Sequence, residues 1–232
     1  MHLFHCADLA TELVELPEEE AHHATGVLRL GVGSVVGLLD GKGTSASAEL
    51  IEVAKKRCVA RMLSREHFPA ERAARIHIAV APTKQMDRYE WFLEKATEIG
   101  VDRITPLTSK RTERDKLRHD RMERLLISAM KQSQRKWLPQ LDAQTPLETI
   151  ARNEAPQRFF GWCEGEHTPF TELYDPGQDA LLLIGPEGDF TAEEAELLRS
   201  KGFRAVSLGA ARLRTETAAL AGCTWMSFAQ QR

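Results

Sequence analysis

The sequence predicts an α/β protein of two domains, a small N-terminal β-barrel and a larger parallel sheet covered by helices. The chain has 232 residues, which is long for one compact domain and comfortable for two. Short strand-like runs fill the first part of the chain, whereas strands and helices alternate in the rest. A composition of 42% hydrophobic and 28% charged residues excludes intrinsic disorder and collagen-like repeats.

The N-terminal domain, residues 1–68, is predicted to consist mainly of short strands. Turn residues separate these strand-like runs, which cover residues 35–39, 47–53 and 57–63. A helix is predicted over residues 17–28, because three glutamates in its first turn would stabilise the positive end of the helix dipole. The polar, proline-containing segment 68–72 is predicted to be a linker, so the second domain is expected to cover residues 69–232.

The second domain is predicted to be a parallel α/β sheet, because strand and helix patterns alternate along it. The predicted strands cover residues 76–79, 104–107, 158–162, 180–184 and 205–207. The predicted helices cover residues 87–99, 117–135, 192–200 and 216–229. Thr191 and Glu194 form a capping-box pattern at the start of one of these helices. Ligands of such sheets bind beyond the carboxyl ends of the strands.

Several classes of protein are excluded by composition. No run of 18 apolar residues exists, and the N-terminus has no signal-peptide pattern, so we expect neither a membrane span nor secretion. The four cysteines are far apart and form no C-x-x-C pair, which predicts no zinc site, no disulfide framework and a reducing cytoplasmic location. The adjacent histidines His22 and His23 would point to different faces of a helix, so no metal site is expected there either.

A local excess of positive charge stands out in a chain whose formal net charge is −3. Between residues 110 and 136 there are ten basic and four acidic residues, too few acids to pair the bases. This pattern favours a surface for nucleic-acid phosphates. The alternative is a solvated helix face whose charges pair with one another.

Two glycine-bearing loops in the last third of the chain predict a small-molecule site. Strand 180–184 runs into the loop 185–188, and strand 205–207 runs into the loop 208–214. Loops at the ends of adjacent parallel strands would line one pocket, and glycine lets backbone groups approach a ligand closely. Glu187 disfavours a phosphate in this pocket and favours a ligand with positive character. The alternative is a pair of tight turns that bind nothing.

The residues of these loops resemble the signature of a known family. The matching segments are Ile184-Gly185-Pro186-Glu187-Gly188, Leu208-Gly209 and Leu213-Arg214-Thr215-Glu216-Thr217-Ala218. They resemble the RsmE family, the 16S rRNA (uracil-N3)-methyltransferases of the SPOUT superfamily. Segments with the family's order and spacing also occur at His23, 27–29, Asp40-Gly41, 94–101 and 132–139. Asp189 departs from the pattern, because the family usually has a third glycine there.

The resemblance implies a fold, a cofactor and an assembly. The fold would be a PUA-like, RNA-binding β-barrel over residues 1–68 and a SPOUT methyltransferase domain with a deep trefoil knot over residues 69–232. The cofactor would be S-adenosylmethionine, and a homodimer would complete each active site. The cofactor-binding residues implied are Ile184, Gly185, Glu187, Gly188, Leu208, Gly209, Leu213 and Thr217.

The implied reaction moves a methyl group from a sulfonium to N3 of a uridine, whose N3 proton is weakly acidic. Such a transfer needs a base or a stabilising cation. Residue chemistry and motif position suggest that Arg214 stabilises the uracil anion and that Glu216 accepts the proton or orients Arg214. Glu187 is another candidate base. The alternative is a mechanism in which in-line alignment supplies most of the rate.

The expected substrate is the 16S rRNA of an assembled small ribosomal subunit. The residues expected to contact this RNA are His23, Arg29, Arg111, Arg114 and Arg135. Two other functions stay open at this point. One is a SPOUT methyltransferase that acts on another RNA or on a ribose 2′-oxygen, and the other is an RNA-binding relic without activity.

Overall fold

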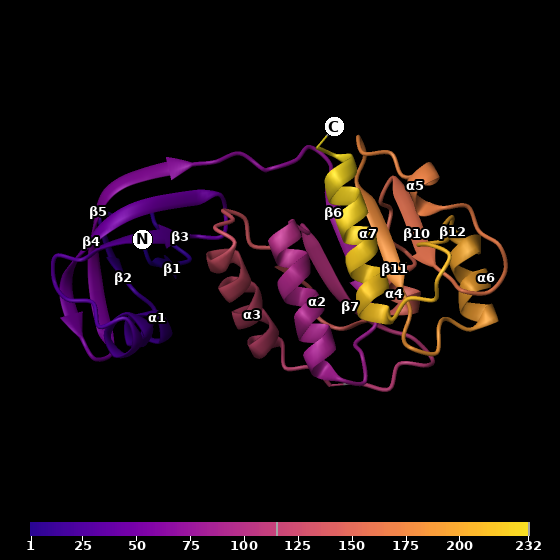
Figure 1. Cartoon of the computed structure of the whole chain (residues 1–232), viewed down its shortest axis with the longest axis horizontal. Helices are drawn as coiled ribbons and strands as arrows, with labels where there is room; N and C mark the ends of the chain where they lie inside the picture. The colour runs from indigo at the N-terminus through magenta and orange to yellow at the C-terminus, as the bar shows by residue number, and fades with distance from the viewer. Residues whose placement is uncertain (115, 232) are drawn as a thin grey trace. The chain divides into compact units, whose positions relative to one another are not determined.

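A computed structural model describes residues 1–114 and 116–231 and divides the chain into two compact units (Figure 1). The first unit consists of Met1–Glu71 and Ile127–Leu138, and the second of Arg72–Leu126 and Pro139–Arg232. The second domain expected from the sequence, residues 69–232, includes 127–138, because a pattern along the chain predicts a helix but not which unit it packs with. Asp115, one of the acids of the basic segment, lies outside the described residues.

The first unit is built on a five-stranded sheet with the order β1-β3-β4-β5-β2. Its strands are β1 (Leu3–His5), β2 (Leu13–Glu15), β3 (Val35–Leu39), β4 (Thr44–Ala54) and β5 (Arg57–His67). β1 pairs with β3 in parallel and the other neighbours are antiparallel. The predicted helix is the short α1 (Glu18–His22), which continues into a π-helical turn, His23–Val27. Sequence analysis missed β1 and β2 because three residues are too few to show an alternating pattern.

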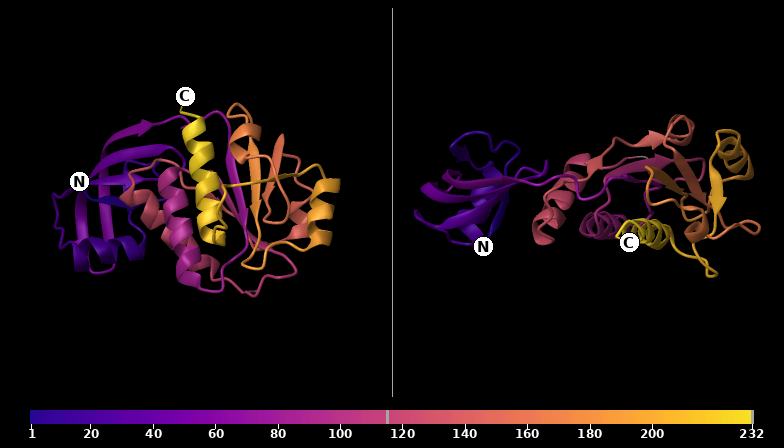
Figure 2. Two further views of the ribbon diagram at one scale, coloured as in Figure 1. Left: turned by 45° about the vertical axis from the view of Figure 1, so that its right-hand side comes forward. Right: turned by 90° about the horizontal axis from the view of Figure 1, so that it is seen from above.

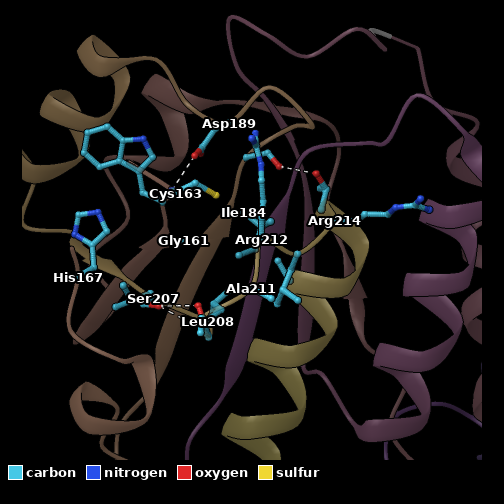
Figure 3. Close-up of a pocket in the computed structure, with 18 of the residues that line it drawn as sticks. Gly161, Cys163, His167, Ile184, Asp189, Ser207, Leu208, Ala211, Arg212 and Arg214 are labelled. Atoms are coloured by element: carbon cyan, nitrogen blue, oxygen red, sulfur yellow. Dashed lines mark hydrogen bonds between the residues drawn. The ribbon is translucent and has the colours of Figure 1, made fainter. Parts of the chain in front are cut away.

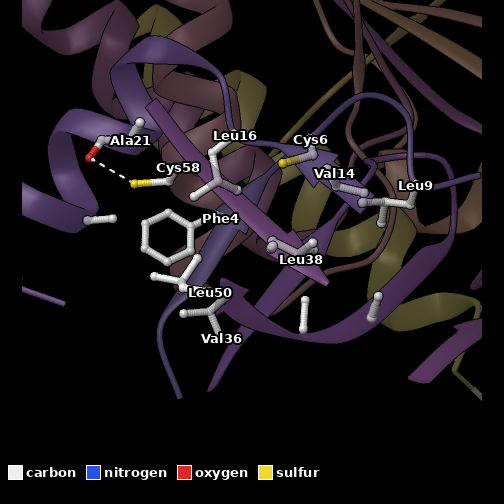
Figure 4. Close-up of a cluster of buried hydrophobic side chains, with 14 residues drawn as sticks. Phe4, Cys6, Leu9, Val14, Leu16, Ala21, Val36, Leu38, Leu50 and Cys58 are labelled. Atoms are coloured by element: carbon white, nitrogen blue, oxygen red, sulfur yellow. Dashed lines mark hydrogen bonds between the residues drawn. The ribbon is translucent and has the colours of Figure 1, made fainter. Parts of the chain in front are cut away.

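The core of the first unit takes buried side chains from all five strands (Figure 4). Phe4 of β1, Val14 of β2, Leu38 of β3, Leu50 of β4 and Cys58 of β5 belong to one cluster. A sheet whose strands all face the same small core has to curve around it, which is the geometry of a small barrel. The predicted N-terminal β-barrel is therefore confirmed.

The second unit is built on a seven-stranded sheet in which every strand pairing is parallel. Its strands are β6 (Ile76–Val80), β7 (Arg103–Thr108), β8 (Gln140–Leu141), β9 (Thr145–Pro146), β10 (Gln157–Gly161), β11 (Ala180–Ile184) and β12 (Arg204–Val206). The order is β12-β10-β11-β6-β7-β8, and β9 also pairs with β7. The predicted parallel α/β sheet is confirmed, whereas the trefoil knot stays a prediction.

Helices cover both faces of this sheet. They are α2 (Met86–Ile99), α4 (Leu147–Ile150), α5 (Phe170–Leu173), α6 (Ala192–Ser200) and α7 (Thr215–Ala229), whereas α3 (His119–Gln132) begins in this unit and ends in the first. α2 and α7 lie side by side on one face (Figures 1 and 2). Gly222 lets α7 approach the sheet closely, because a Cβ there would lie 2.2 Å from Leu182 Cδ2. Alternate residues of β11, Leu181 and Leu183, join a cluster with side chains of α4 and α6.

No helix within the described residues is long and apolar enough to cross a membrane. In the same part of the chain, no three histidine, cysteine or acidic side chains come together in a way that could hold a metal ion.

Candidate functional site

A large cavity opens at the carboxyl ends of three neighbouring strands, β10, β11 and β12 (Figure 3). Its volume is about 1020 Å³, at the upper end of the range typical of small-molecule sites. Three loops form its walls, one after each strand. The lining residues that sequence analysis expected to bind the cofactor are Ile184, Gly185, Glu187, Leu208, Gly209 and Leu213.

The shape of the loop after β11 depends on Asp189, whose backbone has the left-handed conformation. Asp189 has φ 63°, a conformation that favours glycine but that aspartate tolerates. Its two carboxylate oxygens accept hydrogen bonds from the backbone N–H groups of Phe190, at 2.8 Å, and Cys163, at 2.9 Å. Asp189 therefore keeps the backbone shape of the family's usual glycine and adds a link to the loop after β10.

The loop after β12 ends at Thr215, the first residue of α7, which makes a buried contact with the loop after β11. Thr215 Oγ1 donates a hydrogen bond of 3.2 Å to the backbone oxygen of Gly185. Gly209 in the same loop has φ 135°, and a Cβ built on it would meet no atom within 4 Å. The backbone at Gly209 thus borders open space in the cavity wall and has a conformation that residues with a side chain rarely adopt.

The third wall, after β10, contains residues that sequence analysis did not assign to the cofactor site. The rings of Trp162 and His167 stack with centroids 5.7 Å apart, and the guanidinium of Arg199 lies 4.5 Å from the Trp162 centroid. Cys163 also lines the cavity. Burial and the nearby carboxylate of Asp189 raise the pKa of the Cys163 thiol, so this cysteine is poorly suited to act as a nucleophile. Only the strand order, with β10 between β11 and β12, brings this wall to the site.

The polar groups that line the cavity fit S-adenosylmethionine. Glu187 and Asp189 both line it, and their carboxylates suit a ligand that carries a sulfonium and an ammonium group. The open space at Gly209 leaves room for a ligand against the backbone. Glu187 also has a structural contact, because its Oε1 accepts a 2.9 Å hydrogen bond from the backbone N–H of Lys84.

A second cavity of about 410 Å³ lies between the first turns of α2 and α7. It is lined by Asp87, Arg88 and Trp91 of α2 together with Arg214, Glu216 and Thr217. Arg214 lines both cavities, so they adjoin each other at this residue. The structure therefore places two of the expected catalytic residues, Arg214 and Glu216, at the second cavity, and it also places Thr217 there rather than among the lining of the first.

Gly188 and Arg111 contact each other at the rim of the first cavity. Arg111 Nη1 donates hydrogen bonds to the backbone oxygens of Gly188 and Phe190. The backbone N–H of Lys110 donates to Glu194 Oε1 at 2.7 Å, so the loop after β7 is fastened to the start of α6 as well. The sequence predicts only an RNA contact for Arg111, because a run of charges does not show which basic residue bonds to its own chain.

Replacing Arg111 by alanine should therefore weaken cofactor binding, through loss of the contacts that hold the loop after β11. We expect the dissociation constant for S-adenosylmethionine, measured by calorimetry, to rise about threefold to tenfold, as for loss of a hydrogen bond from a charged donor at an exposed site. Arg118→Ala is the control, because Arg118 pairs with the exposed Asp120, at 3.2 Å, and does not line the cavity. Equal cofactor affinity in the two variants would show that Arg111 does not support the loop.

The remaining residues expected to contact RNA have different surroundings. His23 and Arg29 are exposed in the first unit, and Arg29, with φ 54°, follows the helical turn His23–Val27 in the left-handed region. The side chain of Arg135 is only 17% exposed and pairs with Glu71. In the second unit, Arg114 Nη2 donates a 3.0 Å hydrogen bond to the backbone oxygen of Lys84.

Comparison with known proteins gives matches over both units. A family model described as RNA methyltransferase domain matches residues 70–227, and one described as RNA methyltransferase PUA domain matches residues 16–63. Ribosomal RNA small subunit methyltransferase E of Synechocystis is 31% identical, over 88% of this chain and 69% of that protein. The protein of the same name from Rickettsia conorii is 28% identical, over 88% of this chain and 84% of that protein.

Two solved structures share the fold along the whole chain. A "probable rRNA-methyltransferase" from Porphyromonas gingivalis has a TM-score of 0.91 and 38% identity, covering 100% of this chain and 99% of that one. Ribosomal RNA small subunit methyltransferase E from Neisseria gonorrhoeae, bound to S-adenosyl methionine, has a TM-score of 0.87 and 26% identity, covering 99% and 98%. The match over residues 70–227, which contain both glycine-bearing loops of the cavity, and the 31% identity to the Synechocystis protein show that the chain belongs to the RNA methyltransferase family of the RsmE type.

Proposed function

We propose that the protein methylates N3 of a uridine in the 16S rRNA of the small ribosomal subunit, with S-adenosylmethionine as methyl donor. The observation that carries this proposal is the pair of adjoining cavities that share Arg214. The larger one has the backbone and carboxylates that suit the donor, and the smaller one holds a base and cations that suit a uracil. The names of the relatives support the choice of RNA.

When bound, the cofactor supplies a methyl group that forms a bond to N3 as its bond to sulfur breaks and leaves the electron pair on sulfur. The chain's own residues have to bind the cofactor and remove the N3 proton. The loops at Gly185 and Gly209 would hold the donor, and the carboxylates of Glu187 and Asp189 would suit its positive charge. Trp162 and the loop after β10 form the third side of the cavity.

Glu216 is the base that we favour for the N3 proton. Glu216 is only 7% exposed, lines the smaller cavity and lies in the first turn of α7. Glu187 lines the larger cavity instead, and its carboxylate already accepts a hydrogen bond from the loop after β6. Arg214, between the two cavities, is in a position to stabilise the negative charge that develops on the uracil oxygens.

The experiment that tests this function is nucleoside analysis of small-subunit rRNA. We expect 3-methyluridine to be missing from the 16S rRNA of a deletion strain and to reappear when purified protein and S-adenosylmethionine are added to its small subunits. Loss of a 2′-O-methylated nucleoside, or of a modification in another RNA, would contradict the proposal and favour a different SPOUT reaction. No loss of any nucleoside, together with no cofactor binding in calorimetry, would indicate an inactive RNA-binding protein.

For the RNA contact we propose the five residues expected from the sequence, His23, Arg29, Arg111, Arg114 and Arg135. Arg29→Ala should weaken binding to small subunits. It should also reduce the slope of log binding constant against log salt concentration by about 0.7 to 0.9, the contribution of one phosphate contact. Arg61→Ala is the matched control, because Arg61 is an exposed arginine of the same unit whose partner is Glu49, at 3.3 Å. Equal salt slopes for the two variants, measured by filter binding, would remove Arg29 from the RNA surface.

We further propose that the protein works as a homodimer in the cytoplasm. Light scattering should then give about twice the chain mass of 26.0 kDa. A monomer with full activity would contradict the view that a second subunit completes the site.

A further inference from the structure

The smaller cavity has a composition that indicates what it binds. We propose that it is the binding site of the uracil base, and that the indole of Trp91 is the surface on which the base stacks. This inference rests on the proposed function and adds to it a substrate-binding residue that lies outside the family's loop segments.

The first observation is the exposure of Trp91. It is 43% exposed although it lies in a helix, α2, whose other aromatic residues, Tyr89 and Phe92, are fully buried. An exposed indole at the edge of a cavity offers an apolar face to a planar ligand, and stacking on aromatic side chains is the usual way in which proteins hold unpaired bases. The cavity volume of about 410 Å³ lies within the range of small-molecule sites.

The second observation is the pattern of polar groups around the cavity. The Watson–Crick edge of uracil presents one N–H donor, at N3, between two carbonyl acceptors, at O4 and O2. The cavity offers the carboxylate of Glu216 as acceptor and the guanidinium groups of Arg88 and Arg214 as donors, with the exposed Asp87 at its rim. Cytosine has no proton on N3 and carries a donor in place of O4, so the same groups match cytosine poorly.

The third observation concerns charge. Glu216 is buried and forms no salt bridge with any other residue in 1–114 or 116–231. Both α2 and α7 begin at the cavity, and neither helix has a side-chain cap at its N-terminus. The open N–H groups and the positive ends of two helix dipoles therefore favour negative charge here, first on Glu216 and then on the uracil when its N3 proton passes to Glu216.

Steady-state kinetics on small ribosomal subunits tests this assignment. Trp91→Ala should lower kcat/KM about 5- to 150-fold, the effect expected from loss of one base–aromatic stack, while the cofactor dissociation constant stays unchanged. Trp91→Phe should recover most of the loss, because phenylalanine keeps a flat ring. Phe228→Ala is the control, because Phe228 is also an exposed aromatic residue, 57% exposed, but lies at the other end of α7 and outside both cavities.

Fluorescence gives a direct readout that does not depend on turnover. In the wild type with bound S-adenosylhomocysteine, uridine should quench tryptophan emission more than cytidine or 3-methyluridine does, and Trp91→Phe should abolish this quenching. If the wild type forms 3-methyluridine but Trp91→Ala has normal kinetics, the inference is wrong and the proposed function stands. A Trp91→Ala variant that is monomeric where the wild type is dimeric would overturn the inference and assign the cavity to subunit contact. Absence of both 3-methyluridine formation and uridine quenching in the wild type would overturn both.

Discussion

Replacing Glu216 by glutamine is expected to lower kcat about 100- to 10 000-fold, the usual contribution of a general base. The amide keeps the size of the side chain and its place in the first turn of α7, where Glu216 is 7% exposed. It cannot accept the N3 proton, so the substrate has to lose that proton to water or hydroxide. Because Glu216 does not line the larger cavity, affinity for S-adenosylmethionine should stay within about twofold of the wild type.

The dependence of the rate on pH separates this role from a structural one. In the wild type, kcat should reach a plateau as the pH rises, because the protein itself supplies the base. In Glu216→Gln it should keep rising with pH, because hydroxide then takes the proton. Glu187→Gln is the control, since it removes a carboxylate from the larger cavity and should act mainly on cofactor affinity. A near-normal rate with an unchanged pH profile in Glu216→Gln would assign catalysis to alignment alone.

Replacing Gly209 by valine is expected to abolish cofactor binding while the protein stays folded. At φ 135° a β-branched residue is strained by about 1 to 3 kcal/mol, and relief of that strain would move the loop after β12. The space around Gly209 is open, because a Cβ there would meet no atom within 4 Å, and Gly209 lies on the exposed surface, so the substitution should not disrupt the core. Its side chain would instead occupy room next to the backbone that the donor needs.

Calorimetry with S-adenosylmethionine measures this effect, and circular dichroism confirms the fold. Gly31→Val is the matched control, because Gly31 also has open space around it but lies in the first unit and has no left-handed φ. Cofactor affinity equal to that of the wild type in a folded Gly209→Val protein would show that the donor does not lie against this loop.

Elements with a strong local signal could be predicted from the sequence. The apolar run of β11 and the capping box of α6 lie at the predicted residues, and the capping contacts Thr191–Glu194 are present in both directions. The glycine-bearing loops were found because each follows a strand directly. Local patterns are sufficient here, since hydrogen bonds between near neighbours determine these structures.

The rest of the site could not be predicted, because it depends on which strands become neighbours. Trp162 and His167 follow β10, and nothing in their own segment shows that β10 lies between β11 and β12. In the sequence, Trp91 is indistinguishable from the other apolar residues of an amphipathic helix. Only the packing of α2 beside α7 shows that this residue is exposed at a cavity. The contact of Arg111 with Gly188 joins loops from separate strands in the same way.

The parallel pairing of β6 with β11 has a consequence for the order in which the chain is made. Ile76 pairs with Ala180, and β6 and β11 are fully buried. During synthesis, β6 leaves the ribosome long before β11 exists. The pairing at the middle of the larger sheet therefore cannot form until most of the chain has been made. The long strands β4 and β5, which are joined by a short turn, can pair much earlier. β7 can pair with one edge of β6 earlier, so a nascent chain that stops before β11 should leave the other edge of this apolar strand unpaired, and a chaperone that binds such edges would have its main opportunity in this interval.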